Sequence, residues 1–79
     1  MTIGAAVKER IIELCREKDI SLNMLCTLSG VTQSTINNIV SGRNKSTTIS
    51  TIKKFCDGLE ITIQDFFNSP IFNDLDQEL

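Results

Sequence analysis

The sequence contains no histidine, tryptophan or tyrosine, and its 79 residues include only three cysteines. Three cysteines and no histidine are one short of the four nitrogen or sulfur ligands of a structural zinc site. No two of these cysteines have C-x-x-C spacing either. Cys15, Cys26 and Cys56 instead fall on apolar helical stripes, which predicts thiols buried as small hydrophobic groups. We therefore expect neither a metal nor a cofactor.

Groups that carry out catalysis are also missing. Besides histidine, the chain lacks a glycine-rich phosphate loop and a pair of carboxylates in a plausible cleft. Its acids fall on solvated helix faces or in the C-terminal segment, and the first helix is expected to expose its whole charged set, Arg10 included. The sequence does not favour an enzyme, and no small-molecule ligand is expected.

Membrane and export signals are absent as well. No stretch approaches the ~18 consecutive apolar residues of a membrane span. The N-terminus has no basic segment followed by an apolar run, so no signal peptide is predicted. We expect a cytoplasmic protein with no membrane partner, folded as one domain with a modest core.

One further absence is local: between Asp19 and Asp57 the chain has no Asp or Glu. Residues 20–56 carry four basic residues, whereas residues 57–79 carry six acids and no base. The whole chain is therefore acidic, with a formal net charge of -2. A surface that lies against phosphates would exclude acids in this way, because they would repel a nucleic-acid backbone. Chance clustering on a solvated face is the alternative, and charge alone does not decide between them.

Apolar spacing predicts an all-α chain of about five short helices, since no run of four or more residues alternates as a strand would. The helices are expected over residues 4–18, 22–29, 33–40, 49–59 and 63–68. Four of them follow a capping hydroxyl, from Ser21, Thr32, Thr48 and Thr62. Gly30 ends the second helix, where a left-handed backbone is needed, and Val31 plugs the turn.

The helical stripes also predict the core. Its expected members are Val7, Ile11, Leu14, Cys15, Leu25, Cys26, Val31, Ile36, Ile39, Ile49, Ile52, Phe55, Cys56, Leu59, Phe66 and Phe67. Leu22 or Leu28 should lie at its margin. The acidic tail carries Ile71, Phe72 and Leu75, and the sequence leaves open whether it docks on the body, docks on a partner or frays.

The polar residues of the helix over 33–40 are unusual for a surface helix. Gln33, Ser34, Asn37 and Asn38 are uncharged, and hydroxyl and short amide side chains form helices poorly. Amides and hydroxyls can donate to and accept from base edges, and Gln or Asn can pair bidentately with adenine. A polar helix with no target is the alternative. The loop that follows, over residues 41–47, has cations and donors suited to phosphate contact.

These features together resemble a known family. The pattern consists of Ser21, Leu25-Cys26, Gly30-Val31-Thr32, Ile36, Ile39 and Gly42, then Thr48-Ile49, Ile52, Phe55-Cys56, Leu59, Ile61-Thr62 and Phe66-Phe67. Over about residues 4–68 it is similar to the phage repressor/Cro type of helix-turn-helix protein, the XRE family. The resemblance implies a five-helix lambda-repressor-like domain over residues 1–69, with a short acidic tail over 70–79. Its second and third helices would form the helix-turn-helix, the third entering the major groove.

The resemblance also implies roles for individual residues. Base contacts would come from Thr32, Gln33, Ser34, Asn37 and Asn38. Phosphate contacts would come from Ser21, Asn23, Thr35, Arg43, Asn44 and Lys45. Two departures stand out: Leu22 replaces a Gln that touches the operator backbone in many members, and Glu60 replaces a usual Gly. If the backbone at Glu60 is left-handed, the replacement costs ~1 kcal/mol.

The function implied is a sequence-specific double-stranded-DNA-binding transcriptional regulator, a repressor that occludes its operator, encoded by a bacterium, phage or mobile element. A homodimer on two half-sites is expected, because one unit contacts few base pairs. The acids of residues 57–79 should then lie on the face turned away from DNA. The alternative is an antitoxin-like or anti-repressor module that uses the tail's apolar residues for protein contacts. Only DNA binding predicts an affinity that falls steeply with salt.

Overall fold

A computed structural model describes residues 1–43 and 46–78 of the chain. Within them lie five α-helices and one turn of 3-10 helix, with no strand: α1 (Ile3–Glu17), α2 (Leu22–Ser29), α3 (Gln33–Val40), α4 (Ile49–Leu59), α5 (Ile63–Phe67) and η1 (Pro70–Phe72). The expected all-α, five-helix fold is confirmed. No helix of the described segments is long and apolar enough to cross a membrane.

Side-chain hydroxyls set the helix starts as predicted. Ser21, Thr32, Thr48 and Thr62 each accept a hydrogen bond from the backbone N–H three residues on, at 3.0–3.2 Å. A fifth cap was not predicted: the Thr2 hydroxyl accepts a hydrogen bond from the Ala5 N–H at 3.1 Å. This cap starts α1 at Ile3, one residue earlier than expected.

Two helix ends have a left-handed backbone. Gly30 ends α2 with φ of 71°, as its lack of a Cβ allows. Glu60 ends α4 with φ of 58°, which confirms the strained conformation considered from the sequence. The two remaining boundaries that differ, Glu17 and Phe67, lie one residue before the predicted ends.

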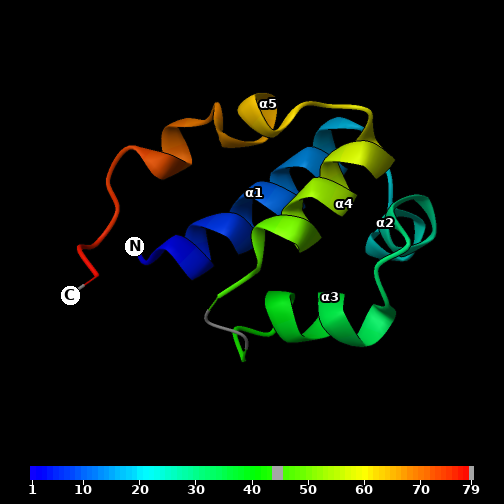
Figure 1. The fold of residues 1–79 in the computed structure, drawn as a ribbon, viewed down its shortest axis with the longest axis horizontal. Coiled ribbons are helices and arrows are strands. Elements are labelled where there is room, and N and C mark those ends of the chain that lie inside the picture. Colours follow the sequence, from blue (N-terminus) through cyan, green and yellow to red (C-terminus); the bar gives the residue numbers. More distant parts are fainter. Residues whose placement is uncertain (44–45, 79) are drawn as a thin grey trace.

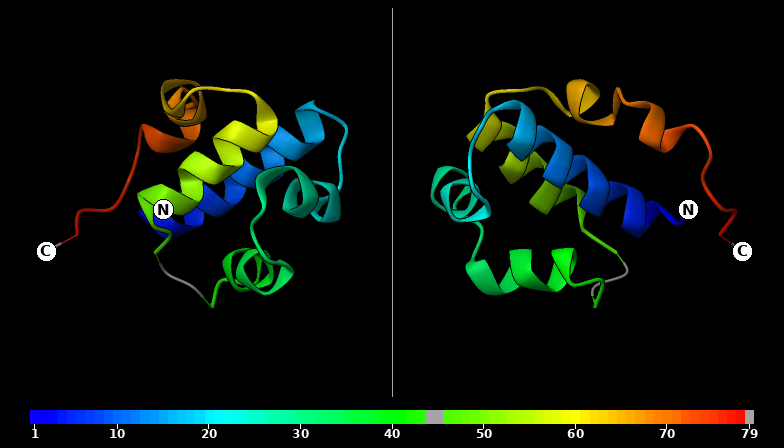
Figure 2. Two further views of the ribbon diagram at one scale, coloured as in Figure 1. Left: turned by 45° about the vertical axis from the view of Figure 1, so that its right-hand side comes forward. Right: turned by 180° about the vertical axis from the view of Figure 1, so that it is seen from behind.

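The helices are arranged around a central pair of segments. Figure 1 shows α1 and α4 crossing the middle of the molecule, α3 along one side, and α5 with η1 along the opposite side. The two rotated views in Figure 2 keep α3 and α5 on opposite sides. Among helix pairs, α2 and α4 pack most closely. The helix-turn-helix unit of α2 and α3 is therefore held to the body through α4.

Gly58 makes the close approach of α2 and α4 possible. A Cβ at this position would lie 2.8 Å from the Leu28 carbonyl carbon and 2.8 Å from the Ser29 nitrogen. Both are backbone atoms of α2, which cannot rotate away as a side chain can. Sequence analysis did not single out this glycine, because only the packed structure shows what faces it.

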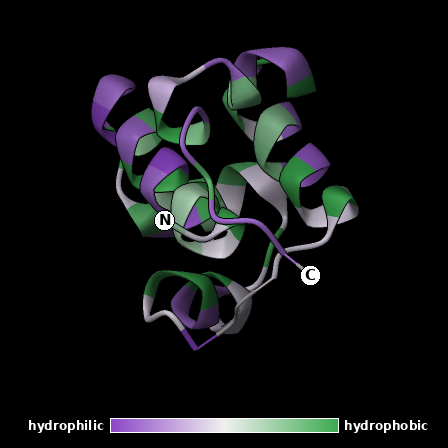
Figure 3. Cartoon of the chain, turned by 90° about the vertical axis from the view of Figure 1, so that its left-hand side faces the viewer, coloured by the Kyte–Doolittle hydropathy of each residue, from purple (hydrophilic) through white to green (hydrophobic). Residues whose placement is uncertain are grey.

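The core largely matches the predicted stripes, and Figure 3 shows the resulting alternation of hydrophobic and hydrophilic ribbon along the helices. Fourteen hydrophobic residues of the described segments are buried, among them Leu25, Phe55 and Phe66 at 0% exposure. Cys26 and Phe67 are only half-buried. Burial raises the pKa of the Cys15 and Cys56 thiols, and Asp57 adds to the effect at Cys56. Both thiols therefore stay protonated at neutral pH.

Two predictions of buried residues, made from the apolar spacing of the helices, need correction. Ile49, expected in the core, is 62% exposed, the highest value among the exposed large hydrophobics. It is the first residue of α4 and lies at the margin of the stripe, where neighbouring helices do not cover it. Of the two candidates for the core margin, Leu22 packs against the core whereas Leu28 is 48% exposed.

Arg10 is the clearest departure from the predicted solvated face of the first helix, since it is only 7% exposed. Its Nε donates to the Phe66 carbonyl at 2.6 Å and its Nη2 donates to the Asp65 carbonyl at 2.8 Å. A third nitrogen pairs with the Glu13 carboxylate. The guanidinium therefore ties α1 to the last turn of α5, whose carbonyls have no partner inside the helix.

The tail docks on the body, which settles one of the alternatives left open by the sequence. The Phe72 ring packs against Phe66 and Phe67, with centroid separations of 6.3 and 5.0 Å. Further along, the Asp76 N–H donates to the Met1 carbonyl at 2.9 Å. The Asp76 carboxylate also lies 3.3 Å from the Met1 ammonium group.

Candidate nucleic-acid interface

The outer face of α3 carries most of the predicted base-contacting residues. Ile36 and Ile39 are 1% and 2% exposed and fix the helix on the body. Val40 also packs against the core and Thr35 is half-buried, whereas the side chains of Gln33, Ser34, Asn37 and Asn38 are exposed. The structure therefore brings these four polar side chains onto one accessible face, with no charged residue in the helix.

The N-terminal end of α3 is organised by hydroxyl groups. Thr32 caps the helix and its Oγ1 lies 2.9 Å from the Oγ1 of Thr35, close enough for a hydrogen bond between the two. Thr32 is exposed and Thr35 is half-buried. A hydroxyl can both donate and accept, so each group keeps capacity for a further partner.

A side-chain contact joins the two helices of the helix-turn-helix. The Gln33 Nε2 donates to the Asn23 Oδ1, across from α3 to α2. Both side chains are exposed. Because Gln33 uses one N–H in this contact, it keeps one N–H and its carbonyl oxygen for another group. Ser21 precedes the first residue of α2, where its hydroxyl caps the helix.

The segment after α3 carries two basic residues in its sequence, and its described residues Gly42 and Arg43 are exposed. Gly42 has a left-handed φ of 79°, which turns the chain away from the helix. Arg43 is exposed, and its Nε donates to the Ser41 hydroxyl at 3.1 Å. The other two predicted phosphate contacts in this segment, Asn44 and Lys45, lie outside the described residues.

One acid of residues 57–79 lies where the charge pattern suggests. Asp65 lies on α5, opposite α3 in Figure 1. Within residues 20–56, which carry no acid, Lys53 pairs with Asp57, the first acid that follows. This ion pair reduces the contribution of Lys53 to the local positive field. Lys54 is exposed.

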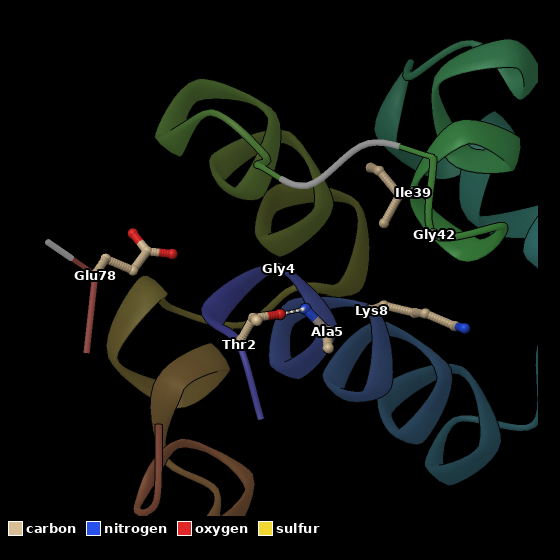
Figure 4. Close-up of a pocket in the computed structure, with 7 residues that line it drawn as sticks. All are labelled: Thr2, Gly4, Ala5, Lys8, Ile39, Gly42 and Glu78. Carbon is tan, nitrogen blue, oxygen red and sulfur yellow. Dashed lines mark hydrogen bonds between the residues drawn. The ribbon is translucent and has the colours of Figure 1, made fainter. Parts of the chain in front are cut away.

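One acid departs from the expected distribution. Glu78 lines a hollow of about 380 Å³ together with Lys8 of α1 and Gly42 at the end of α3 (Figure 4). The Glu78 side chain lies near the start of α1, at the other end of this hollow from Gly42, so this acid does not lie with α5 on the face opposite α3. Sequence reasoning placed Lys8 on a solvated face, and no signal in the sequence indicates that this lysine borders the same hollow as Gly42.

Residues 10–70 match the family of Cro/C1-type helix-turn-helix DNA-binding domains. The chain belongs to that family. Among solved structures, the crystal structure of the prophage Lp1 protein 11 has 40% sequence identity to this chain. The match covers 95% of this chain and 99% of that one, with a TM-score of 0.82. Among curated proteins, none matches the chain.

The Cro/C1-type match confirms the resemblance and the fold inferred from the sequence. The family is one of DNA-binding regulators rather than enzymes. Together with the geometry of α2 and α3, it makes this chain a helix-turn-helix DNA-binding regulator.

Proposed function

We propose that the chain is a sequence-specific transcriptional repressor that places α3 in the major groove of double-stranded DNA. The observation that carries the proposal is the outer face of α3, where exposed, uncharged amides and hydroxyls stand on two buried isoleucines. The groove is about 12 Å wide and admits one helix. The absence of acids over residues 20–56 removes the charge that would repel the phosphates on either side.

Base contacts in this proposal come from the exposed positions of α3. Gln33, Asn37 and Asn38 have amides that can pair with the N6 and N7 edge of adenine. Thr32 and Ser34 have hydroxyls that accept from or donate to several bases. Gln33 stands first in the helix, where side chains of a recognition helix reach deepest into the groove.

Phosphate contacts would fix the position of α3 without specifying sequence. Their proposed donors are Ser21, Asn23, Thr35, Arg43, Asn44 and Lys45. The contact between Gln33 and Asn23 supports a linked role, because it joins a base-contacting amide to a residue facing the DNA backbone. Asn23 would thus supply a polar contact to the DNA backbone that Leu22 cannot make, because the leucine side chain is apolar.

Repression would follow from occlusion of the operator. A homodimer on two half-sites would place two copies of α3 in successive major grooves, about 34 Å apart. We assign DNA binding to residues 1–69 and treat residues 70–79 as a short acidic tail. The similarity to a prophage protein supports an origin in a phage or other mobile element and action in the bacterial cytoplasm.

The alternative, an antitoxin-like or anti-repressor module, has less support. It needs the apolar residues of the tail for a partner. Phe72 instead packs against Phe66 and Phe67 of the same chain, and Ile71 and Leu75 are half-buried. Little apolar surface of the tail is left for another protein.

A binding-site selection from a random duplex library at low salt tests the proposal. We expect one enriched motif, with an affinity that falls linearly on a log–log plot against salt, by about 0.9 for each phosphate neutralised. Recovery of no preferred sequence, or an affinity independent of salt, would overturn the repressor proposal.

A further inference from the structure

A lysine of the first helix lies beside the end of α3. Lys8 lines the hollow of about 380 Å³ that Ile39 and Gly42 border at the C-terminal end of α3. In Figure 4 the Lys8 side chain extends away from Glu78, which lies near the start of α1 at the other end of the hollow. Lys8 is half-buried, so its apolar stem packs along the hollow while its ammonium group reaches solvent.

The Lys8 ammonium group has no acidic partner among the described residues. None of the ion pairs between these residues includes Lys8, and no other side-chain contact occupies its charge. Side chains that meet on the surface of a helix lie three or four positions apart. Those positions around Lys8 hold Gly4, Ala5, Ile11 and Ile12, none of which is an acid. The charge of Lys8 is therefore available to a group outside the chain.

Arg10, two residues further along α1, shows the opposite use of a basic side chain. Its guanidinium group donates to the carbonyls of Asp65 and Phe66 and pairs with Glu13. Residues 1–19 carry four bases and four acids, so the sequence alone suggests a neutral segment. The structure separates these charges, because Arg10 is committed inside the fold whereas Lys8 borders the flank of α3.

We propose that Lys8 binds a phosphate of the DNA backbone beside the C-terminal end of α3. The inference rests on the proposed DNA-binding function and adds a contact from α1, outside both the helix-turn-helix and the acid-free residues 20–56. Arg43 is exposed and directly follows Gly42, so cations from two separate elements flank the same end of α3. A lysine ammonium group is a compact charge with three donors, which suits a phosphate oxygen.

The position of Lys8 indicates a phosphate rather than a base as the partner. Ile39, which borders the same hollow, is 2% exposed and lies on the inner side of α3. The side chains proposed to contact bases, such as Gln33 and Asn37, are on the outer side of the helix. A cation at the flank meets the backbone at the edge of the groove, so Lys8 would position the protein without specifying sequence.

The experiment measures binding of the full chain to the selected duplex and to a scrambled duplex across a salt series. Lys8→Met keeps a long apolar stem and removes the charge. We expect its salt slope to be lower by about one, with binding to both duplexes weaker by about tenfold at about 0.1 M salt. Lys8→Arg keeps the charge and should keep the slope.

Lys53→Met is the matched control, because it removes the same charge from a lysine that is already paired with Asp57. It should leave the salt slope unchanged. Ethylation interference on the selected duplex then locates the contact. Ethylation of one backbone phosphate in each half-site should weaken binding of the wild type and have no further effect on Lys8→Met.

An unchanged salt slope in Lys8→Met, or equal losses of slope in Lys8→Met and Lys53→Met, would overturn the inference while the DNA-binding proposal survives. Weakening confined to the selected duplex would also overturn it, because that result indicates base contact. Absence of wild-type binding to any duplex would instead overturn the proposed function, and the inference with it.

Discussion

The α3 side of the molecule and the opposite side, formed by α5 and η1, differ in how their residues are used. On the α5 side, Phe66 and Arg10 are buried, and Arg10 donates to the last carbonyls of the helix. On the α3 side, two isoleucines hold the helix and its polar side chains project outward, joined by a few hydrogen bonds at the surface. Side chains that stabilise the fold and side chains proposed to bind DNA therefore occupy separate regions, and substitutions can test this separation.

The largest effect is expected from Phe66→Ala on the α5 side. Phe66 is 0% exposed and packs against Phe67 and Phe72, so its loss leaves a cavity at the junction of α5 and η1. We expect the free energy of unfolding to fall by about 3–5 kcal/mol, measured by urea denaturation. Ser34→Ala on the α3 side, the comparison variant, should change it by less than about 0.5 kcal/mol. Equal losses in the two variants would contradict the separation.

Gly58→Ala tests the contact that joins the helix-turn-helix to the body. The added Cβ would meet the α2 backbone at 2.8 Å, so α2 must shift. We expect a net destabilisation of about 1–3 kcal/mol, since overpacking outweighs the better helix propensity of alanine. Thermal unfolding checks this, and a stabilised variant would show that α2 and α4 lie farther apart.

Arg43→Ala tests phosphate contact without base contact. Arg43 is exposed, and its Nε donates only to the nearby Ser41 hydroxyl at the surface. Loss of the side chain should therefore hardly change the free energy of unfolding. We expect weaker binding to all duplexes alike and a salt slope lower by about one. Fluorescence anisotropy on the selected motif and on a scrambled duplex, across a salt series, measures both. Weakening confined to the selected motif would assign Arg43 to base contact instead.

Glu60→Gly should give the smallest change, and it is the one expected to stabilise. Glu60 is exposed and holds a left-handed backbone, which costs a residue with a Cβ about 1 kcal/mol. We expect the free energy of unfolding to rise by up to that amount, with DNA binding unaltered. The matched control is Glu17→Gly, at the regular end of α1, which should destabilise instead.

The sequence predicted the helices well because local signals define them. Capping hydroxyls and apolar periodicity are properties of neighbouring residues, and they placed α2, α3 and α4 at their observed bounds. The buried isoleucines of α3 followed from the same periodicity. Most residues predicted to contact DNA are exposed, and Thr35 is half-buried. Asn44 and Lys45 lie outside the described residues, and all of the DNA contacts stay predictions.

What the sequence did not predict depends on pairs of residues far apart in the chain. Arg10 has charged neighbours in the sequence, which suggests a solvent-exposed side chain. In the structure it is buried and donates to the carbonyls of Asp65 and Phe66, which are 55 and 56 residues away in the sequence. Ile49 continues an apolar stripe, yet it is 62% exposed at the start of α4, whereas Ile52 one turn later is buried. Neither outcome can be inferred from one helix alone, because it is decided by what the fold brings beside that helix.

The most direct test of the central claim compares the selected binding motifs of the wild type and Gln33→Ala. If the outer face of α3 contacts bases, the variant should lose about 1–3 kcal/mol on the best site and relax the preference at one position of each half-site. Its free energy of unfolding should stay as in the wild type, because Gln33 is exposed. An unchanged motif and affinity in the folded variant would contradict the account, since α3 would then not present Gln33 to the bases.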